Sequence, residues 1–375
     1  MKFIGPLDRR FTIGIAIAAT VPAFALTHLI VTRYRDQRQD LAVEWSRRGD
    51  RELERRPALA VTDFQTALSY GPERADDRLR LANALIAAKR PTEAKAQLLT
   101  LWGEEPGNGE VNLALARLSA GHGDVTDAVR YYHAAVDGAW ETGAATARRR
   151  ARLDLARLLM SHGQPIRAQA ELIALIDDLP ANARLITNVG QLLIDAGAPE
   201  RAIGLFRRVL ELDPTDAEAA RLAGEVEYRA GDFEAANRDL QRASTRAALN
   251  GDARDMLDVS DRVLTLDPYA ARLAARARAQ RVLRALVIAR ARLVRCQGTP
   301  AHDAATDARI GTLQVRLDAT GTLTPRALER DADLVDDALA VVFDVERLPP
   351  AACGGDSADD RALAIIAGPH PALTQ

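Results

Sequence analysis

The stretch that decides the fold is ARLITNVGQLLIDAGAPERAIGLFRRVLELDPTD, residues 183–216. Its apolar residues recur at the three- and four-residue spacing of an amphipathic helix, both before and after a break at residues 197–199. Pro214 ends the second segment, because proline cannot continue a helix. Gly190 lies where another helix must come close, and the small residues Gly190 and Ala202 beside the large residues Leu193 and Phe206 suit tight packing. The stretch therefore predicts a tight hairpin of two helices.

The features of this hairpin recur along the chain with a period of about 34 residues. One unit, which contains Ala116, is spaced about six residues wider than the others. A single helical hairpin cannot bury its own apolar face, so neighbouring copies are expected to stack against it. The prolines that keep the phase are Pro72, Pro106, Pro180 and Pro214.

This pattern resembles the tetratricopeptide repeat over residues 41–250, where six copies follow one another. The resemblance implies an all-α fold, an α-solenoid of helical hairpins that presents an extended concave surface to other proteins. The residues that match the family's small, alanine, aromatic and proline positions are Gly190, Ala202, Phe206 and Pro214.

The chain is predicted to have five parts, of which only the third is regularly repeated. After the repeats, helices are expected at residues 252–268, 269–294, 303–317 and 324–343, because apolar positions and turn residues alternate there. The parts are a basic tail (1–10), a transmembrane anchor (11–31), six repeats (41–250), a degenerate seventh hairpin with a long helix (251–295), and a helical C-terminal region with a disordered tail (296–375).

Residues 11–31, FTIGIAIAATVPAFALTHLIV, contain no Lys, Arg, Asp or Glu and have the length of a bilayer-spanning helix. We therefore expect a single-pass anchor in the inner (cytoplasmic) membrane. A cleaved signal peptide is the alternative, since small residues near Ala25 suit a cleavage site and cleavage there would release the body. Apolar residues continue to Val31, beyond that point, which favours the anchor.

The two cysteines, Cys296 and Cys353, lack the close spacing of a zinc site or a redox motif. A disulfide between them would place the body in an oxidising compartment such as the periplasm. Two unrelated buried thiols are the alternative. Arginines flank the apolar segment on both sides, so the positive-inside rule does not decide the orientation.

The resemblance also implies which side chains face the concave groove, since the family directs fixed positions of each first helix into it. Arginine is frequent at these positions, and its guanidinium group matches carboxylates, which predicts partners with acidic segments or a terminal carboxylate. Solvated surface arginine is the alternative, because arginine replaces lysine almost throughout the chain. The predicted groove residues are Asn83, Arg150, Arg157, Arg184, Gln191, Arg221 and Arg229.

No pattern in the sequence predicts catalysis. The six histidines lack metal-ligand spacing, and neither a phosphate-binding glycine loop nor a nucleophile elbow occurs. The formal net charge of −2 gives no general attraction to nucleic acid. We therefore expect no catalytic, cofactor-binding or metal site.

These observations predict a membrane-anchored scaffold that binds protein partners in the assembly of a bacterial cell-envelope, secretion or polysaccharide-export complex. In one alternative, residues 296–375 carry an activity that the repeats position. In another, the chain is a structural subunit that self-associates through the helix at 269–294. The sequence leaves the partner and the oligomeric state open.

Overall fold

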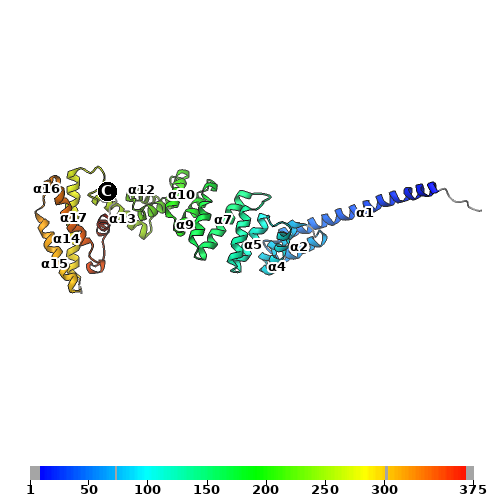
Figure 1. The fold of residues 1–375 in the computed structure, drawn as a ribbon, viewed down its shortest axis with the longest axis horizontal. Helices are drawn as coiled ribbons and strands as arrows, with labels where there is room; N and C mark the ends of the chain where they lie inside the picture. Colours follow the sequence, from blue (N-terminus) through cyan, green and yellow to red (C-terminus); the bar gives the residue numbers. More distant parts are fainter. Residues whose placement is uncertain (1–8, 72–73, 300–302, 369–375) are drawn as a thin grey trace, which may run out of the picture. The chain divides into compact units, whose positions relative to one another are not determined.

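The computed structural model describes residues 9–71, 74–299 and 303–368, except for the side chains of residues 9–19, 21 and 22. Within these residues every regular element is a helix, apart from one isolated β-bridge between Asn108 and Ala139. The chain divides into two compact units, Met1–Asp178 and Leu179–Gln375 (Figure 1).

The first unit contains the following helices in chain order: α1 (Arg9–Glu52), α2 (Pro57–Tyr70), α3 (Ala75–Ala87), α4 (Pro91–Glu104), α5 (Gly109–Gly121), α6 (Val125–Asp137), α7 (Ala144–Ser161), α8 (Pro165–Ile173) and the 3-10 helix η1 (Ile176–Asp178). Each odd-numbered helix packs against the next even-numbered one, so the unit consists of hairpins. Short connections join each hairpin to the next along the chain.

The second unit continues the same arrangement and then departs from it. Its helices are α9 (Ala183–Asp195), α10 (Pro199–Leu212), α11 (Ala217–Arg229), α12 (Phe233–Ser244), α13 (Gly251–Leu266), α14 (Ala275–Gly298), α15 (Ala304–Ala319), η2 (Thr320–Thr322), α16 (Pro325–Arg330), α17 (Ala332–Glu346), η3 (Pro350–Cys353) and α18 (Ala358–Ile366).

The predicted hairpin of residues 183–216 is present as α9 and α10. A Cβ atom added to Gly190 would lie 2.6 Å from Cε1 of Phe206, so only glycine lets the two helices approach this closely. Gly224 meets Leu240 in the same way in the next hairpin, at 2.7 Å. The contact between a small and a large residue therefore recurs where the sequence predicted it, and the structure confirms the tetratricopeptide-like solenoid.

The turns and helix starts follow from local chemistry. Gly197 adopts φ +83°, a left-handed conformation that glycine accepts without steric cost, and it reverses the chain between α9 and α10. The side chain of Asn182 accepts a hydrogen bond from the backbone N–H of Leu185 at 2.9 Å and so caps α9. The hairpin of α9 and α10 thus begins and turns at residues whose roles follow from local chemistry.

After the sixth hairpin, α11 and α12, a single helix precedes the long helix α14. This helix, α13, packs mainly against α12 and against α18 from the end of the chain, and it also touches α11 and α14. The long helix begins at Ala275 rather than at residue 269, because Pro268 is followed by a turn in which Arg272 has a positive φ of +61°. The C-terminal helix therefore takes the place that a repeat partner would have.

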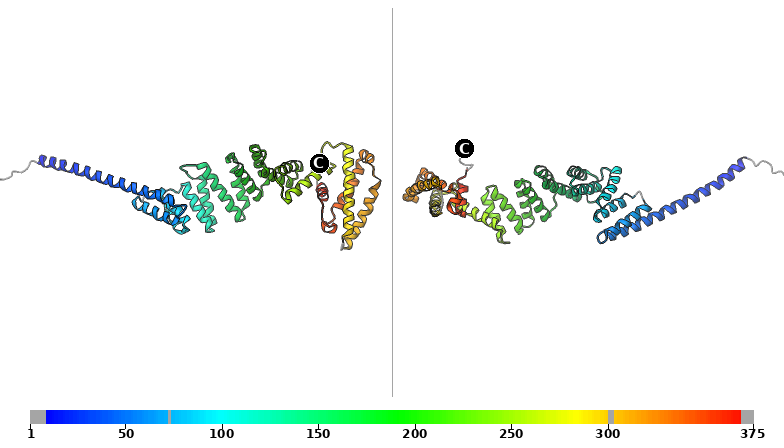
Figure 2. Two further views of the ribbon diagram at one scale, coloured as in Figure 1. Left: turned by 180° about the vertical axis from the view of Figure 1, so that it is seen from behind. Right: turned by 90° about the horizontal axis from the view of Figure 1, so that it is seen from below.

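The helix predicted at 324–343 is two helices in the structure. Asp331 ends α16, and its side chain accepts hydrogen bonds from the backbone N–H groups of Asp333 and Leu334, which starts α17. The sequence interpretation overlooked this cap. Helix α14 lies beside α15, α16 and α17 (Figure 2). These helices share one apolar core with α13 and α18.

A disulfide bond between Cys296 and Cys353 joins α14 to the segment between α17 and α18. One turn before Cys296, the fully buried Arg292 donates a hydrogen bond to the carbonyl oxygen of Leu348 at 2.9 Å. The guanidinium group of Arg292 also lies 3.4 Å from the carboxyl group of Glu346. The disulfide bond and these polar contacts therefore hold the segment between α17 and α18 to the same face of α14.

Three carboxyl groups surround two guanidinium groups in this buried cluster. Arg292 pairs with Asp356 and Asp360, and Arg295 also pairs with Asp360. Burial raises the pKa of Glu346 to about 8, and the charge of Arg292 only partly opposes this effect. A proton on Glu346 therefore balances the cluster at neutral pH.

Among the side chains that the structure describes, no helix offers a stretch that is both long and apolar enough to cross a bilayer. The predicted anchor, residues 11–31, is helical within α1, but its side chains 11–19, 21 and 22 lie outside the described residues. The membrane anchor therefore stays a prediction.

Replacing Gly190 by alanine should lower the free energy of unfolding by about 1–3 kcal/mol, because the added methyl group overlaps the ring of Phe206. Chemical denaturation measures this effect. The matched control is Gly204→Ala on α10, where the added Cβ meets nothing within 4 Å. That change should raise the free energy of unfolding by about 0.5–1 kcal/mol, since alanine is a better helix former than glycine. Equal effects at both positions would contradict the packing argument.

The stability of the C-terminal helices should fall as the pH rises. The pKa of Glu346 is raised from its ordinary value of 4.5 to about 8, so folding favours the protonated form. The resulting stabilisation is complete below pH 4.5 and is lost as the pH rises through 8. Urea unfolding between pH 5 and pH 9 measures the slope. Glu346→Gln should remove this component of the slope, and an unchanged slope would contradict the assignment.

Candidate functional site

A hollow of about 400 Å³ lies in the first unit, across the first helices of three successive hairpins. Helices α3, α5 and α7 each contribute side chains, and the connection between α6 and α7 adds one more. The lining residues are Asn83, Ile86, Glu110, Leu113, Ala114, Arg117, Leu118, Trp140, Ala147 and Arg150. The hollow thus lies on the side of the hairpins that the repeat pattern predicts for binding.

The connection between α6 and α7 contains the additional residues of the widely spaced unit. Its backbone pairs with the start of α5, since the N–H of Gly109 donates to the carbonyl oxygen of Ala139 at 2.8 Å. The N–H of Ala139 donates in turn to the carbonyl oxygen of Gly107 at 2.9 Å. These bonds fix the connection against α5 and bring Trp140 to the hollow.

Trp140 forms one wall of the hollow and is held from two sides. Its indole N–H donates to the carbonyl oxygen of Ala135 at 2.9 Å. A Cβ atom added to Gly109 would lie 2.4 Å from the indole ring, so the missing side chain of this glycine makes room for the tryptophan. Ile86, Leu113 and Leu118 supply further apolar surface. The site can therefore accept an apolar side chain.

The two arginines that line the hollow differ in their ion pairs. Arg117 donates to the carboxylate of Asp154 at 2.7 Å. Among the described residues, Arg150 forms no ion pair, and the amide of Asn83 makes no hydrogen bond. Burial raises the pKa of Glu110, and the nearby charges of Glu141 and Asp76 add to this effect. Arg150 is thus the cation of this hollow that is available to a ligand.

Two of the predicted groove residues, Asn83 and Arg150, line the hollow together. Arg157 lies further along α7, is exposed, and comes within 3.8 Å of Asp154. The structure therefore brings part of the predicted set to one site and leaves Arg157 outside it.

The other four predicted residues belong to the second unit, where carboxylates engage most of their polar groups. Arg221 pairs with Glu218 and Glu225, and Arg229 lies 3.7 Å from Glu225. The amide of Gln191 donates to Asp195 at 3.0 Å, whereas Arg184 is exposed and has no ion pair among the described residues. Arginine content alone therefore overstates the positive character of this surface.

Sequence reasoning missed Trp140, although a signal for it was present. The unit spaced about six residues wider interrupts an otherwise regular period, and the structure shows that these residues carry the tryptophan. An insertion into a repeat maps to a loop, and such loops often lie on the binding face. The wider spacing of this unit thus indicated where the binding hollow lies.

Comparisons with known proteins agree with this architecture. One model of the tetratricopeptide repeat matches residues 53–118 and 193–258, and a second model of the same repeat matches residues 153–217. No protein of curated function is similar enough in sequence to be matched.

Solved structures of repeat proteins are similar to this chain in fold. YrrB, a protein described as having an unusual peptide-binding site, is 19% identical, with a TM-score of 0.41, over 51% of this chain and 95% of its own. The type IV pilus biogenesis factor PilW is 17% identical, with a TM-score of 0.38, over 60% and 98%. The C-terminal part of a repeat protein from Cytophaga hutchinsonii is 15% identical, with a TM-score of 0.44, over 64% and 94%.

The chain therefore contains tetratricopeptide repeats, and such repeats imply a protein-interaction scaffold. Tetratricopeptide-repeat proteins bind protein partners, and the fold is typically non-enzymatic.

Proposed function

We propose that this chain is an assembly scaffold of the bacterial cell envelope, and that the hollow across α3, α5 and α7 binds a segment of a partner protein. The observation that carries the proposal is the combination, in one hollow, of an apolar wall at Trp140 with the unpaired Arg150. A partner segment would place a large apolar side chain against Trp140 and a carboxylate on Arg150.

The geometry of the hollow suits a peptide rather than a small polar ligand. Its lining combines apolar side chains with a few polar groups at the edges, which is the usual composition of a recognition site. The amide of Asn83 can donate to and accept from a peptide backbone, and it has no other partner among the described residues. Arg150 adds specificity for a carboxylate, which a guanidinium group binds with two parallel hydrogen bonds.

The proposed compartment rests on the disulfide between Cys296 and Cys353. Disulfides persist in oxidising compartments and are rare in the bacterial cytosol. The apolar segment 11–31 provides the proposed attachment to the inner membrane, with the repeats on the periplasmic side.

Arg150→Glu should weaken the binding of a short labelled peptide that carries a leucine next to aspartates by about tenfold or more, because it replaces attraction with repulsion. Trp140→Ala should weaken it by a similar factor through lost apolar contact. Fluorescence anisotropy with the full chain measures both effects, and circular dichroism checks that the variants are folded.

The control variants for this experiment are Arg221→Glu and Arg201→Glu, which make the same charge change elsewhere. Arg201 is exposed on α10 and forms no ion pair among the described residues. Arg221 is already paired with Glu218 and Glu225, so its replacement should leave the affinity nearly unchanged. An equal loss with either control would show that general positive charge binds the peptide, and the hollow would not be the site.

In freshly lysed native cells, Cys296 and Cys353 should react with a maleimide reagent only after reduction, because the disulfide removes both thiols. Gel mobility after alkylation with a polyethylene-glycol maleimide measures the number of free thiols. Cells treated with a reductant before alkylation provide the positive control. Reaction of both cysteines without reduction would contradict the proposed oxidising compartment.

A further inference from the structure

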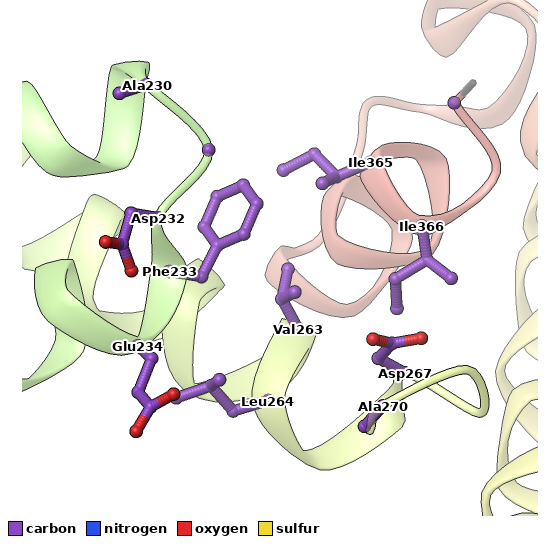
Figure 3. A pocket seen from close by; sticks show the side chains of 12 residues that line it. Ala230, Asp232, Phe233, Glu234, Val263, Leu264, Asp267, Ala270, Ile365 and Ile366 are labelled. Carbon is purple, nitrogen blue, oxygen red and sulfur yellow. The ribbon is translucent and has the colours of Figure 1, made fainter. Parts of the chain in front are cut away.

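A second pocket, of about 600 Å³, lies in the second unit between the last repeat and the C-terminal helix. Its walls come from the turn before α12, the end of α13 with the turn after it, and the end of α18 (Figure 3). The pocket does not involve the first helices of the hairpins, and so it differs in kind from the hollow of the first unit.

The interior of this pocket is apolar. Phe233 and Ile365 extend toward each other across the opening, and Val263 lies between them at the base (Figure 3). Phe233 is supported from behind by an edge-to-face contact with Tyr228, with the ring centroids 5.4 Å apart. A large aliphatic side chain placed here would contact apolar surface from three helices.

The position of Phe233 is a departure from the repeat. The second helix of the hairpin begins with proline in α2, α4, α8 and α10 and with valine in α6, whereas α12 begins with phenylalanine. The preceding Gly231 adopts φ +81°, as the equivalent Gly197 does, so the turn itself is conserved in shape between these hairpins. The aromatic ring is therefore not required by the turn.

The opposite wall is fixed in place before any ligand binds. Helix α18 is tied to α13 by ion pairs of Arg262 with Asp359, at 2.8 Å, and of Arg361 with Asp255. The hydroxyl and backbone N–H of Ser357 donate to Asp360, which caps α18, and the disulfide at Cys353 holds the preceding loop. A preformed wall reduces the ordering cost of binding.

The rim of the pocket is negatively charged. Asp232, Glu234 and Asp267 line it, and none of the described lining residues is Lys, Arg or His. Neither Asp232 nor Glu234 forms an ion pair among the described residues, although Asp232 accepts a hydrogen bond from the backbone N–H of Ala235. An apolar ligand group flanked by cations would therefore complement both the interior and the rim.

We propose that this pocket is a second protein-docking site, which takes a large aliphatic side chain from a partner segment that carries arginine or lysine on either side of it. The two sites then select opposite charges: the hollow beside Arg150 takes carboxylates, and this pocket takes cations. The inference does not depend on the proposed function of the hollow, since the two sites share no residue.

The test uses the full chain and a short labelled peptide in which two leucines are flanked by arginines. Glu234→Arg should weaken its binding by about fivefold or more, because an attractive charge at the rim becomes repulsive. Ala270→Phe should abolish binding by filling the pocket. The affinity should also fall as salt is added, since the rim charges are exposed.

The matched control is Glu200→Arg, which changes the same second position of α10. It should leave the affinity unchanged. Peptides with glutamates in place of the arginines, or alanines in place of the leucines, should not bind.

Three outcomes would overturn the proposal. The first is equal weakening by Glu200→Arg and Glu234→Arg. The second is self-association of the free chain in sedimentation that Ala270→Phe abolishes, since a second copy would then occupy the pocket. The third is binding that appears only in a chain shortened to end at Gly368, since the tail would then be the occupant.

Discussion

The structure depends on one steric constraint, the close contact between a small residue on the first helix of a hairpin and a large residue on the second. Gly190 against Phe206 is the clearest case, and Gly224 against Leu240 repeats it. Each hairpin presents an apolar face to the next, and stacking of these faces buries the core. With the helices packed in this way, the repeat period of the sequence is also the repeat period of the stacked hairpins.

Both candidate sites arise where the chain departs from the repeat pattern, in spacing before Trp140 and in residue type at Phe233. The additional residues between α6 and α7 bring Trp140 to the hollow of the first unit, and Phe233 replaces proline at the edge of the second pocket. A regular repeat needs the same residues in every copy for packing. Residues that packing does not require are free to serve recognition, and so departures from the pattern are informative about function.

The C-terminal helices are held differently from the repeats. Here Arg292 is buried among carboxyl groups, and the disulfide at Cys296 lies one turn away on the same helix. Removing a partner from such a cluster would leave a buried charge, which is strongly unfavourable. These links hold α18 to α14, and the ion pairs of Arg262 with Asp359 and of Arg361 with Asp255 hold it against α13, where it forms a wall of the second pocket.

The sequence by itself determined the helical hairpins and their phase, because these follow from residues close together in the chain. It also identified Asn83 and Arg150 as groove residues, and both line the hollow. Only the tertiary structure decided that Trp140 joins them, that Glu225 engages Arg221, and that α18 completes the second pocket. Periodicity shows which face of a helix is apolar. Which distant side chains meet on that face, and which charges they neutralise, depends on packing between segments that no local pattern links.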